Sequence, residues 1–286
     1  SLQQKKMGKG RDMAGGDVEA HYTKDGLYQR IMDALAAIGK DIGNLTPGDL
    51  DPVEHFHGRG VAATAEMAKS LNPKPGDEIL DIGSGIGGPA RYVARTYGCS
   101  VVGIDLTAEF CATARRLNGD VGLADKVQIE QGSATDLPFE DGRFDAAYSQ
   151  NVSMNIADKA AYFGEAFRVL RPGGLFALSD IGLGDGADVL YPVPWSSDGV
   201  YSFLLTEQET IAAAEKAGFE VLSVKDHTPV SLQFYQSQRE NAARGDIPKL
   251  GVFILMGDNA KEKGRNSARN IEEGRVRPLE FVCRRS

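Results

Sequence analysis

The chain has 286 residues, of which 42% are hydrophobic and 25% charged, a composition typical of a folded globular protein. Its formal net charge of −8 argues against nucleic acid as a main partner, because phosphate binding needs a basic surface. Cys99, Cys111 and Cys283 are widely spaced and form no disulfide framework or zinc motif, so we expect a reducing, cytoplasmic setting. The longest apolar run, residues 252–256, is far shorter than the roughly 20 residues that cross a bilayer, so no membrane partner is expected.

The N-terminal quarter of the chain is expected to contain helices but no strand. Residues 1–17 are polar and rich in glycine, and we expect them to be disordered. Residues 18–74 are predicted to form a helical cap that precedes the main domain. Apolar residues recur at helical spacing in two parts of this cap, 18–40 and 60–71, and each is predicted to be a helix.

From residue 75 to the C-terminus, apolar runs alternate with helical patterns. The expected strands are 78–82, 100–105, 126–131, 144–149, 174–181 and 219–226, and the expected helices are 87–97, 107–118, 157–169 and 207–217. This alternation predicts an α/β fold with a mostly parallel sheet and helices on both faces. A last strand at 279–283 is predicted to pair antiparallel beside the strand at 219–226.

A long segment, residues 228–277, separates the last two predicted strands. Connections of this length without secondary structure are uncommon, and helical patterns lie near 231–244 and 259–273. We interpret the segment as an insertion within the domain 75–286. It either covers the ligand site or is a helical appendage.

The most informative motif is the junction at residues 79–91, which read ILDIGSGIGGPAR. Gly83, Gly85 and Gly87 lack a Cβ atom, so the chain can turn tightly there and approach a ligand closely. With Gly88 the run is also a G-x-G-x-x-G pattern, which is typical of dinucleotide sites. Asp105 ends the next predicted strand, where its carboxylate can accept hydrogen bonds from a ribose, or can cap the helix that follows.

Four motifs, which follow one another along the chain, help to decide which nucleotide-like ligand the glycine turn binds. They are DIGSGIG from Asp81, the acidic strand end at Asp105, GSATDLPF at 132–139 and RVLRPGG at 168–174. Together they resemble class I S-adenosylmethionine-dependent methyltransferases over residues 75–226. The resemblance implies a Rossmann-like sheet and S-adenosyl-L-methionine as cofactor. The alternatives are an NAD-dependent oxidoreductase on the same glycine turn and a non-catalytic protein that binds S-adenosylmethionine.

The resemblance implies cofactor contacts at the positions that match the family's motifs. Asp81 would help to orient the amino group of the methionine part, and Asp105 would hold the ribose. Leu106 and Ala134 would pack on the adenine, with plain core packing as the alternative. Tyr22 is a further candidate to reach over the cofactor, with core packing as the alternative. The full set of expected cofactor-binding residues is Tyr22, Asp81, Gly83, Ser84, Gly85, Gly87, Asp105, Leu106, Ser133, Ala134 and Gln150.

Three further segments indicate a narrower group. Residues 51–64 (DPVEHFHGRGVAAT), 87–94 (GGPARYVA) and 148–159 (YSQNVSMNIADK) resemble the glycine, sarcosine and dimethylglycine N-methyltransferases and their relatives. The implied acceptor is the amine nitrogen of a small molecule, with O- or C-methylation as the alternative. Related enzymes often carry a histidine where this chain has Asn155, which makes that position a catalytic candidate. His57 is the second catalytic candidate, because the stretch FHGRG leads into the predicted helix at 60–71; a surface or capping role is the alternative.

The acceptor itself is expected to meet the aromatic loop at 182–205. Aromatic faces attract cationic methyl groups, so Tyr191, Trp195 and Tyr201 are the predicted substrate-binding residues. The alternative is that these rings attach a long loop to the core. The sequence shows no metal-ligand cluster, and a small-molecule acceptor is the one partner it indicates, with a homodimer left open.

Overall fold

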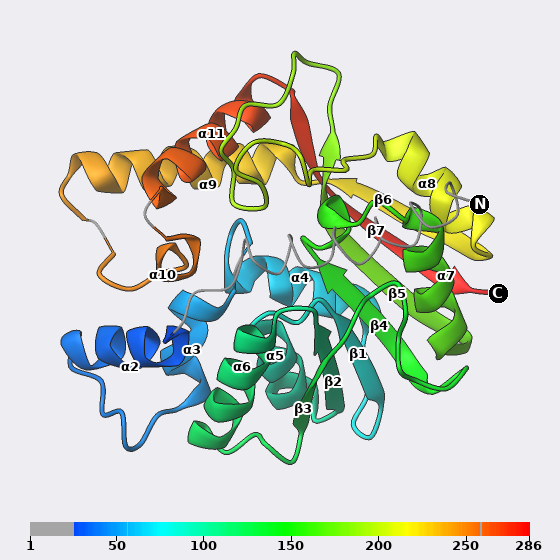
Figure 1. Cartoon of the computed structure of the whole chain (residues 1–286), viewed down its shortest axis with the longest axis horizontal. Coiled ribbons are helices and arrows are strands. Elements are labelled where there is room, and N and C mark those ends of the chain that lie inside the picture. Colours follow the sequence, from blue (N-terminus) through cyan, green and yellow to red (C-terminus); the bar gives the residue numbers. More distant parts are fainter. Residues whose placement is uncertain (1–25, 56, 247, 258) are drawn as a thin grey trace, which may run out of the picture.

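The computed structural model describes residues 26–55, 57–246, 248–257 and 259–286. Within these ranges, seven strands form one sheet in the order β3-β2-β1-β4-β5-β7-β6 (Figure 1). The strands are β1 (Glu78–Ile82), β2 (Ser100–Asp105), β3 (Val127–Gln131), β4 (Phe144–Gln150), β5 (Leu170–Leu183), β6 (Phe219–Asp226) and β7 (Val276–Arg285). The order reverses between β1 and β4, which places a ligand crevice at the carboxyl ends of these two strands.

The last strand, β7, inserts between β5 and β6 and is antiparallel to both. Its central residues Leu279, Phe281 and Cys283 are each at most 2% exposed. The alternation of these buried residues places them on one face of the sheet, as expected for a strand with period two. The predicted mostly parallel sheet with an antiparallel last strand is therefore confirmed.

Helices cover both faces of the sheet, as predicted. One face packs against α7 (Lys159–Val169) and α8 (Glu207–Lys216), through a core that includes Tyr162 and Phe176. The other face packs against α4 (Val61–Leu71), α5 (Gly88–Tyr97) and α6 (Ala108–Asp120). The start of α8 is fixed by a capping box, in which Thr206 Oγ1 accepts from the Glu209 amide and Glu209 Oε2 accepts from the Thr206 amide.

The N-terminal segment contributes α2 (Leu27–Ala37) and α3 (Pro47–Glu54), which come before α4. The predicted disorder of 1–17 and residues 18–25 of the predicted cap lie outside the described residues. Helix α3 was not predicted. Its start is marked by a Thr46–Asp49 capping box and Pro47, but Pro52 and the polar residues in between interrupt any apolar periodicity.

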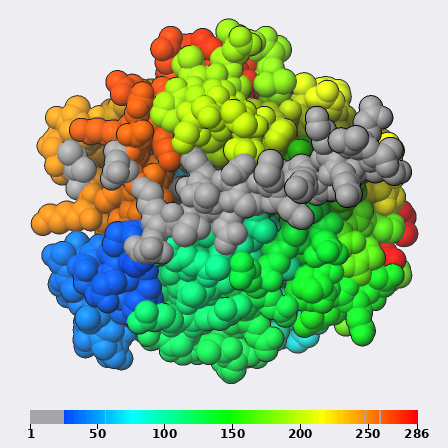
Figure 2. All heavy atoms as spheres, in the orientation of Figure 1, coloured from blue at the N-terminus to red at the C-terminus, as the bar shows by residue number. Residues whose placement is uncertain are grey.

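The insertion forms α9 (Thr228–Ala243), α10 (Phe253–Met256) and α11 (Ala260–Glu272). Leu250 and Leu255 near α10 share a core with Leu35 of α2 and Leu50 of α3, so the insertion packs against the N-terminal helices. The space-filling view shows α11 and the loop after β5 in the upper part of the molecule and α2, α3 and α6 in the lower part (Figure 2). Among the described residues, no helix combines the length and apolarity needed to cross a membrane.

Candidate active site

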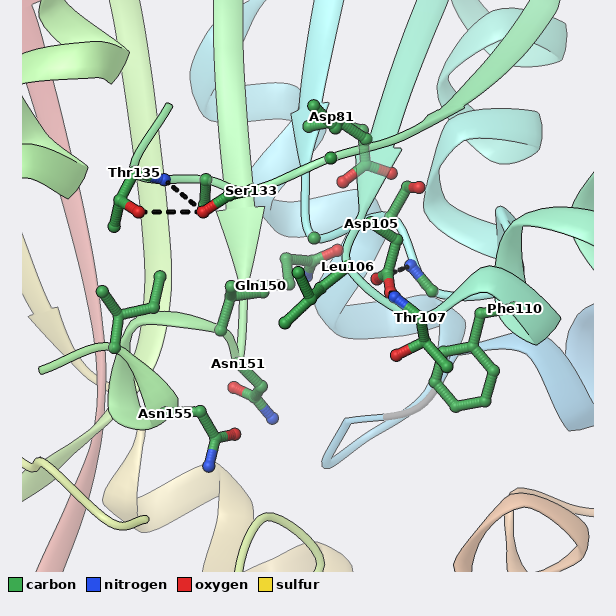
Figure 3. Close-up of a pocket in the computed structure, with 18 of the residues that line it drawn as sticks. Asp81, Asp105, Leu106, Thr107, Phe110, Ser133, Thr135, Gln150, Asn151 and Asn155 are labelled. Carbon is green, nitrogen blue, oxygen red and sulfur yellow. Dashed lines mark hydrogen bonds between the residues drawn. The ribbon is translucent and has the colours of Figure 1, made fainter. Parts of the chain in front are cut away.

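A cavity of about 680 Å³ lies at the carboxyl ends of β1, β2 and β4. Side chains from these strand ends and from the turns after them converge on it (Figure 3). Asp81 and Asp105 lie on one side of the cavity, while Asn151 and Asn155 lie on the opposite side (Figure 3). The cavity therefore occupies the ligand crevice that the strand order creates.

The glycine turn after β1 has a conformation that only glycine adopts without strain. Gly83, Gly85 and Gly87 have φ angles of 79°, 52° and 82°. A Cβ atom on Gly83 would lie 2.2 Å from a methyl carbon of Val152 across the cavity wall. On Gly88 it would lie 2.3 Å from the backbone oxygen of Glu54. The glycines thus permit both the turn and the close approach of the neighbouring segments.

The Asp105 carboxylate orders this turn from the end of β2. Its Oδ2 accepts a hydrogen bond of 2.8 Å from the Gly85 amide, and its Oδ1 accepts one of 2.9 Å from the Thr107 amide. Thr107, not Asp105, is the N-cap residue of α6. Asp105 therefore connects the glycine turn to the start of α6 and still faces the cavity.

Asp81 is the most perturbed acid of the cavity. It is 2% exposed, and burial, with a further contribution from Asp105, raises its pKa to about 8. The hydroxyl of Tyr148, itself fully buried, donates to Asp81 Oδ2 at 3.0 Å and opposes this rise. A buried carboxyl that is protonated near neutral pH is suited to a cationic ligand group, because such a group stabilises its ionised form.

Two buried polar atoms in the cavity wall fit a polar ligand. Ser84 Oγ and Gln150 Nε2 have no hydrogen-bond partner among the described residues. Gln150 is oriented by its other amide atom, Oε1, which accepts from Thr64 Oγ1 at 3.3 Å. Buried polar groups are nearly always hydrogen-bonded in native proteins, so these two atoms indicate donors and acceptors supplied by a ligand.

Comparison with known proteins agrees with this geometry. Residues 80–178, from β1 through the glycine turn to β5, match a family model described as a methyltransferase domain. This segment therefore has the sequence pattern of a methyltransferase domain. The chain spans about half the length of two curated relatives, methyltransferase phqN of Penicillium fellutanum and sterol 24-C-methyltransferase of Eremothecium gossypii.

Relatives of the methyltransferase domain act on different acceptors. Sarcosine/dimethylglycine N-methyltransferase of Halorhodospira halochloris is 29% identical over 197 residues, which are 66% of this chain and 68% of that protein. The sterol 24-C-methyltransferase is 31% identical over 203 residues, or 63% of this chain and 50% of its own. Phosphoethanolamine N-methyltransferase 2 of Haemonchus contortus has a similar fold, with a TM-score of 0.68 at 22% identity, over 89% of this chain and 57% of that one.

Most of the predicted site residues of the methyltransferase domain line the cavity. Those that do are His57, Asp81, Gly83, Ser84, Gly85, Asp105, Leu106, Ser133, Ala134, Gln150, Asn155 and Tyr201. Gly87, Tyr191 and Trp195 are not part of its lining, and Tyr22 lies outside the described residues. The lining also includes residues that were not predicted, among them Glu54, Thr107, Phe110 and Asn151.

The predicted acceptor loop after β5 meets the cavity through Tyr201 and Phe203 only. Trp195 is 5% exposed and packs with Met154 and Val193, and its Nε1 donates to Ser202 Oγ at 3.0 Å. The position of Trp195 therefore favours the alternative in which this ring attaches the loop to the core.

We expect Trp195→Ala to destabilise the protein by about 3–5 kcal/mol, because it removes a buried aromatic ring and leaves a cavity. Equilibrium urea denaturation measures this change. Val200→Ala is the matched control from the same loop, since Val200 is 61% exposed and its removal should change stability little. A Trp195→Ala protein as stable as the control, with lower turnover, would instead assign the ring to acceptor binding.

Proposed function

We propose that this chain transfers a methyl group from S-adenosylmethionine to the amine nitrogen of a small molecule. The observation that carries the proposal is the neutral polar character of the cavity beside Gln150. His57 contributes to it, because burial and the repulsion of His55 lower the pKa of its imidazole to about 3. Gln150, Asn151 and Asn155 add amide groups without charge. A wall of this kind suits an amine in its unprotonated, nucleophilic form.

The bound cofactor supplies an electrophilic methyl group: its S–CH₃ bond breaks as the N–CH₃ bond forms, sulfur keeps the electron pair, and the acceptor nitrogen loses one proton. The chain holds the two reactants at attack distance and limits the access of water. Under this proposal Asp81 faces the ammonium group of the cofactor, Asp105 accepts from its ribose, and Leu106 and Ala134 contact its adenine. The N-methyltransferases among the relatives support an amine acceptor, and the sterol methyltransferase provides the alternative of a carbon acceptor.

Calorimetric titration with S-adenosylhomocysteine, with NADH as a parallel ligand, tests the cofactor part of the proposal. Saturable binding of the first alone is the expected result, and binding of NADH alone would contradict it. The acceptor part is tested by the formation of S-adenosylhomocysteine with glycine, sarcosine, dimethylglycine and phosphoethanolamine. Turnover of a sterol or another carbon acceptor, with none of these amines, would overturn the assignment to nitrogen.

We expect Asn155→Ala to weaken acceptor binding more than cofactor binding. Asn155 Nδ2 donates to the backbone oxygens of Trp195 and Tyr201, both at 2.8 Å, and so holds the loop at the cavity. Loss of hydrogen bonds worth about 1–3 kcal/mol corresponds to a rise of roughly 5- to 150-fold in the acceptor KM. Steady-state kinetics with Val200→Ala as the control measure the effect. An equal loss of affinity for S-adenosylhomocysteine would argue against a role confined to the acceptor loop.

A further inference from the structure

One wall of the cavity is formed by a short segment that follows β4. Six of the eight residues from 151 to 158 line the cavity, namely Asn151, Val152, Asn155, Ile156, Ala157 and Asp158. The other two, Ser153 and Met154, are buried and form with Asn155 a short 3-10 helix, η1 (Ser153–Asn155). The conformation of this wall, residues 151–158, therefore decides the shape of the cavity on the side of Asn151 and Asn155 (Figure 3).

The wall 151–158 contains little regular structure that could fix it. Asn151 has a φ angle of 57°, in the left-handed region, which costs energy for residues other than glycine. Its amide donates to the Ser179 backbone oxygen at 2.8 Å, and the Met154 backbone oxygen accepts from the Phe203 amide at 2.7 Å. A backbone of this kind persists only where its surroundings determine it, so the contacts behind η1 help to keep the wall in place.

Ser153 connects η1 to two charged side chains behind the wall. Its hydroxyl donates a hydrogen bond to Asp180 Oδ2, and its backbone oxygen accepts one from Lys159 Nζ. Asp180 lies on β5 and is 6% exposed, and its Oδ1 accepts from the Ile181 amide at 2.9 Å. Lys159 is the first residue of α7. Ser153 is thus held through both its side chain and its backbone, by charge-assisted hydrogen bonds, which are stronger than neutral ones.

The positions of these two charged groups are unfavourable for stability alone. Burial raises the pKa of Asp180 and lowers the pKa of Lys159 to about 8, because each group loses solvation of its charged form. The attraction between the two charges opposes both shifts. Lys159 also lies at the N-terminus of α7, where the helix dipole disfavours a positive charge. Buried charges contribute little net stability under such conditions, whereas they can fix one arrangement of the chain.

We propose that Asp180 and Lys159 are positioning residues of the methyl transfer, which through Ser153 keep the wall 151–158 in the conformation that the acceptor requires. The inference rests on the proposed methyl transfer but not on the identity of the acceptor. Neither side chain is part of the cavity lining, so both act on the reaction through the wall. Their effect reaches the cavity through η1, because Asn155 lines the cavity and holds the loop after β5 beside it.

Lys159→Met tests the proposal, because methionine has a similar length but neither the charge nor the donors. We expect kcat/KM for the acceptor to fall about 10- to 100-fold, since a small misplacement of the reactants has an effect of this size. Affinity for S-adenosylhomocysteine, measured by calorimetry, should be unchanged. Lys159→Arg keeps a cation with donors and should recover most of the rate, and Lys216→Met, an exposed change on α8, is the control. Equal losses of kcat/KM and of cofactor affinity would indicate a general structural role and overturn the proposal.

Asp180→Asn tests the same wall from β5, because asparagine keeps the shape of the side chain but not its charge. We expect it to lower kcat/KM for the acceptor as well, again without a change in affinity for S-adenosylhomocysteine. Since both charges act through Ser153, the loss in the double variant with Lys159→Met should be smaller than the product of the two single losses. Losses that simply multiply would contradict an action through one residue.

A third measurement does not require turnover. Amide hydrogen exchange of the full chain, followed by mass spectrometry, reports on the local opening of each segment. We expect Lys159→Met and Asp180→Asn to speed exchange in the wall 151–158 but not in the glycine turn at 83–88. Unchanged exchange of the wall in both variants would overturn the proposal. If the native protein bound S-adenosylhomocysteine but methylated no acceptor, the proposed function would fail, and the exchange result would still decide whether the two charges hold the wall.

Discussion

Asp81→Asn is expected to stabilise the ligand-free protein while it weakens cofactor binding. The Asp81 carboxyl has a pKa of about 8 in the folded chain, against 3.8 for the ordinary group. The folded state therefore holds this proton more tightly than the unfolded state, and stability falls as the pH rises from about 4 to about 8. Asparagine keeps the shape and removes the ionisation. We expect a gain of up to about 5 kcal/mol at pH 8.

The same carboxyl predicts that cofactor binding releases a proton. An ammonium group placed against Asp81 favours its ionised form, so affinity for S-adenosylhomocysteine should rise with pH up to about 8 and then level off. In Asp81→Asn the affinity should be about 10- to 100-fold lower and independent of this ionisation. Calorimetry in two buffers with different ionisation enthalpies measures the proton release directly.

Tyr148→Phe provides the matched variant for this linkage. Its hydroxyl donates to Asp81 Oδ2 at 3.0 Å, and this hydrogen bond lowers the pKa of the acid. Its removal should move the pH at which affinity levels off to a higher value. An affinity of the native protein that is the same from pH 6 to pH 8 would refute the assignment of Asp81 to the ammonium group.

The parts of the fold that the sequence predicts are those with a local pattern. The glycine turn, the acid at the end of β2 and the alternation of strands and helices each lie within a short stretch, so the α/β sheet was predictable. The antiparallel pairing of β7 beside β6 was predicted from the long segment that separates the two strands, but its insertion between β5 and β6 was not. Helix α3 was not predicted, because Pro52 and its polar neighbours interrupt the apolar periodicity from which helices are predicted.

The site depends more than the fold on contacts between residues that are distant in the sequence. Fewer of its features could therefore be predicted from the sequence. His55, His57 and Gln150 each belong to a recognisable motif, but only the fold brings Thr64 of α4, which contacts both histidines, to Gln150 at the end of β4. Trp195 was predicted to contact a ligand, because it is an aromatic residue in a loop near the cavity. Only the structure shows that its ring is buried in the core. Periodicity and motif spacing do not contain this information.

Arg91→Met is expected to destabilise the protein strongly. Arg91 is fully buried, and its guanidinium donates to Glu54 Oε2 at 2.7 Å, Asn118 Oδ1 at 2.7 Å and the Ile86 backbone oxygen at 2.6 Å. It thus holds α3, α6 and the glycine turn together from the first turns of α5. Removal of one partner of a buried ion pair typically costs about 3–5 kcal/mol, because the other charge remains buried without compensation.

A double-mutant cycle separates the buried charge from the lost packing. Glu54→Gln combined with Arg91→Met removes the unpaired carboxylate, so the double variant should be more stable than Arg91→Met alone. Arg95→Met, one turn further along α5, is the control, because its pair with Asp51 is partly exposed and surface pairs contribute roughly 0–1 kcal/mol. Urea denaturation of the native protein, the two single variants, the double variant and Arg95→Met gives the comparison. Arg91 also donates a hydrogen bond to the backbone oxygen of Ile86 in the glycine turn. Arg91→Met should therefore lower the affinity for S-adenosylhomocysteine, and Arg95→Met should not. Equal losses of affinity in the two variants would contradict this role of Arg91 in the glycine turn.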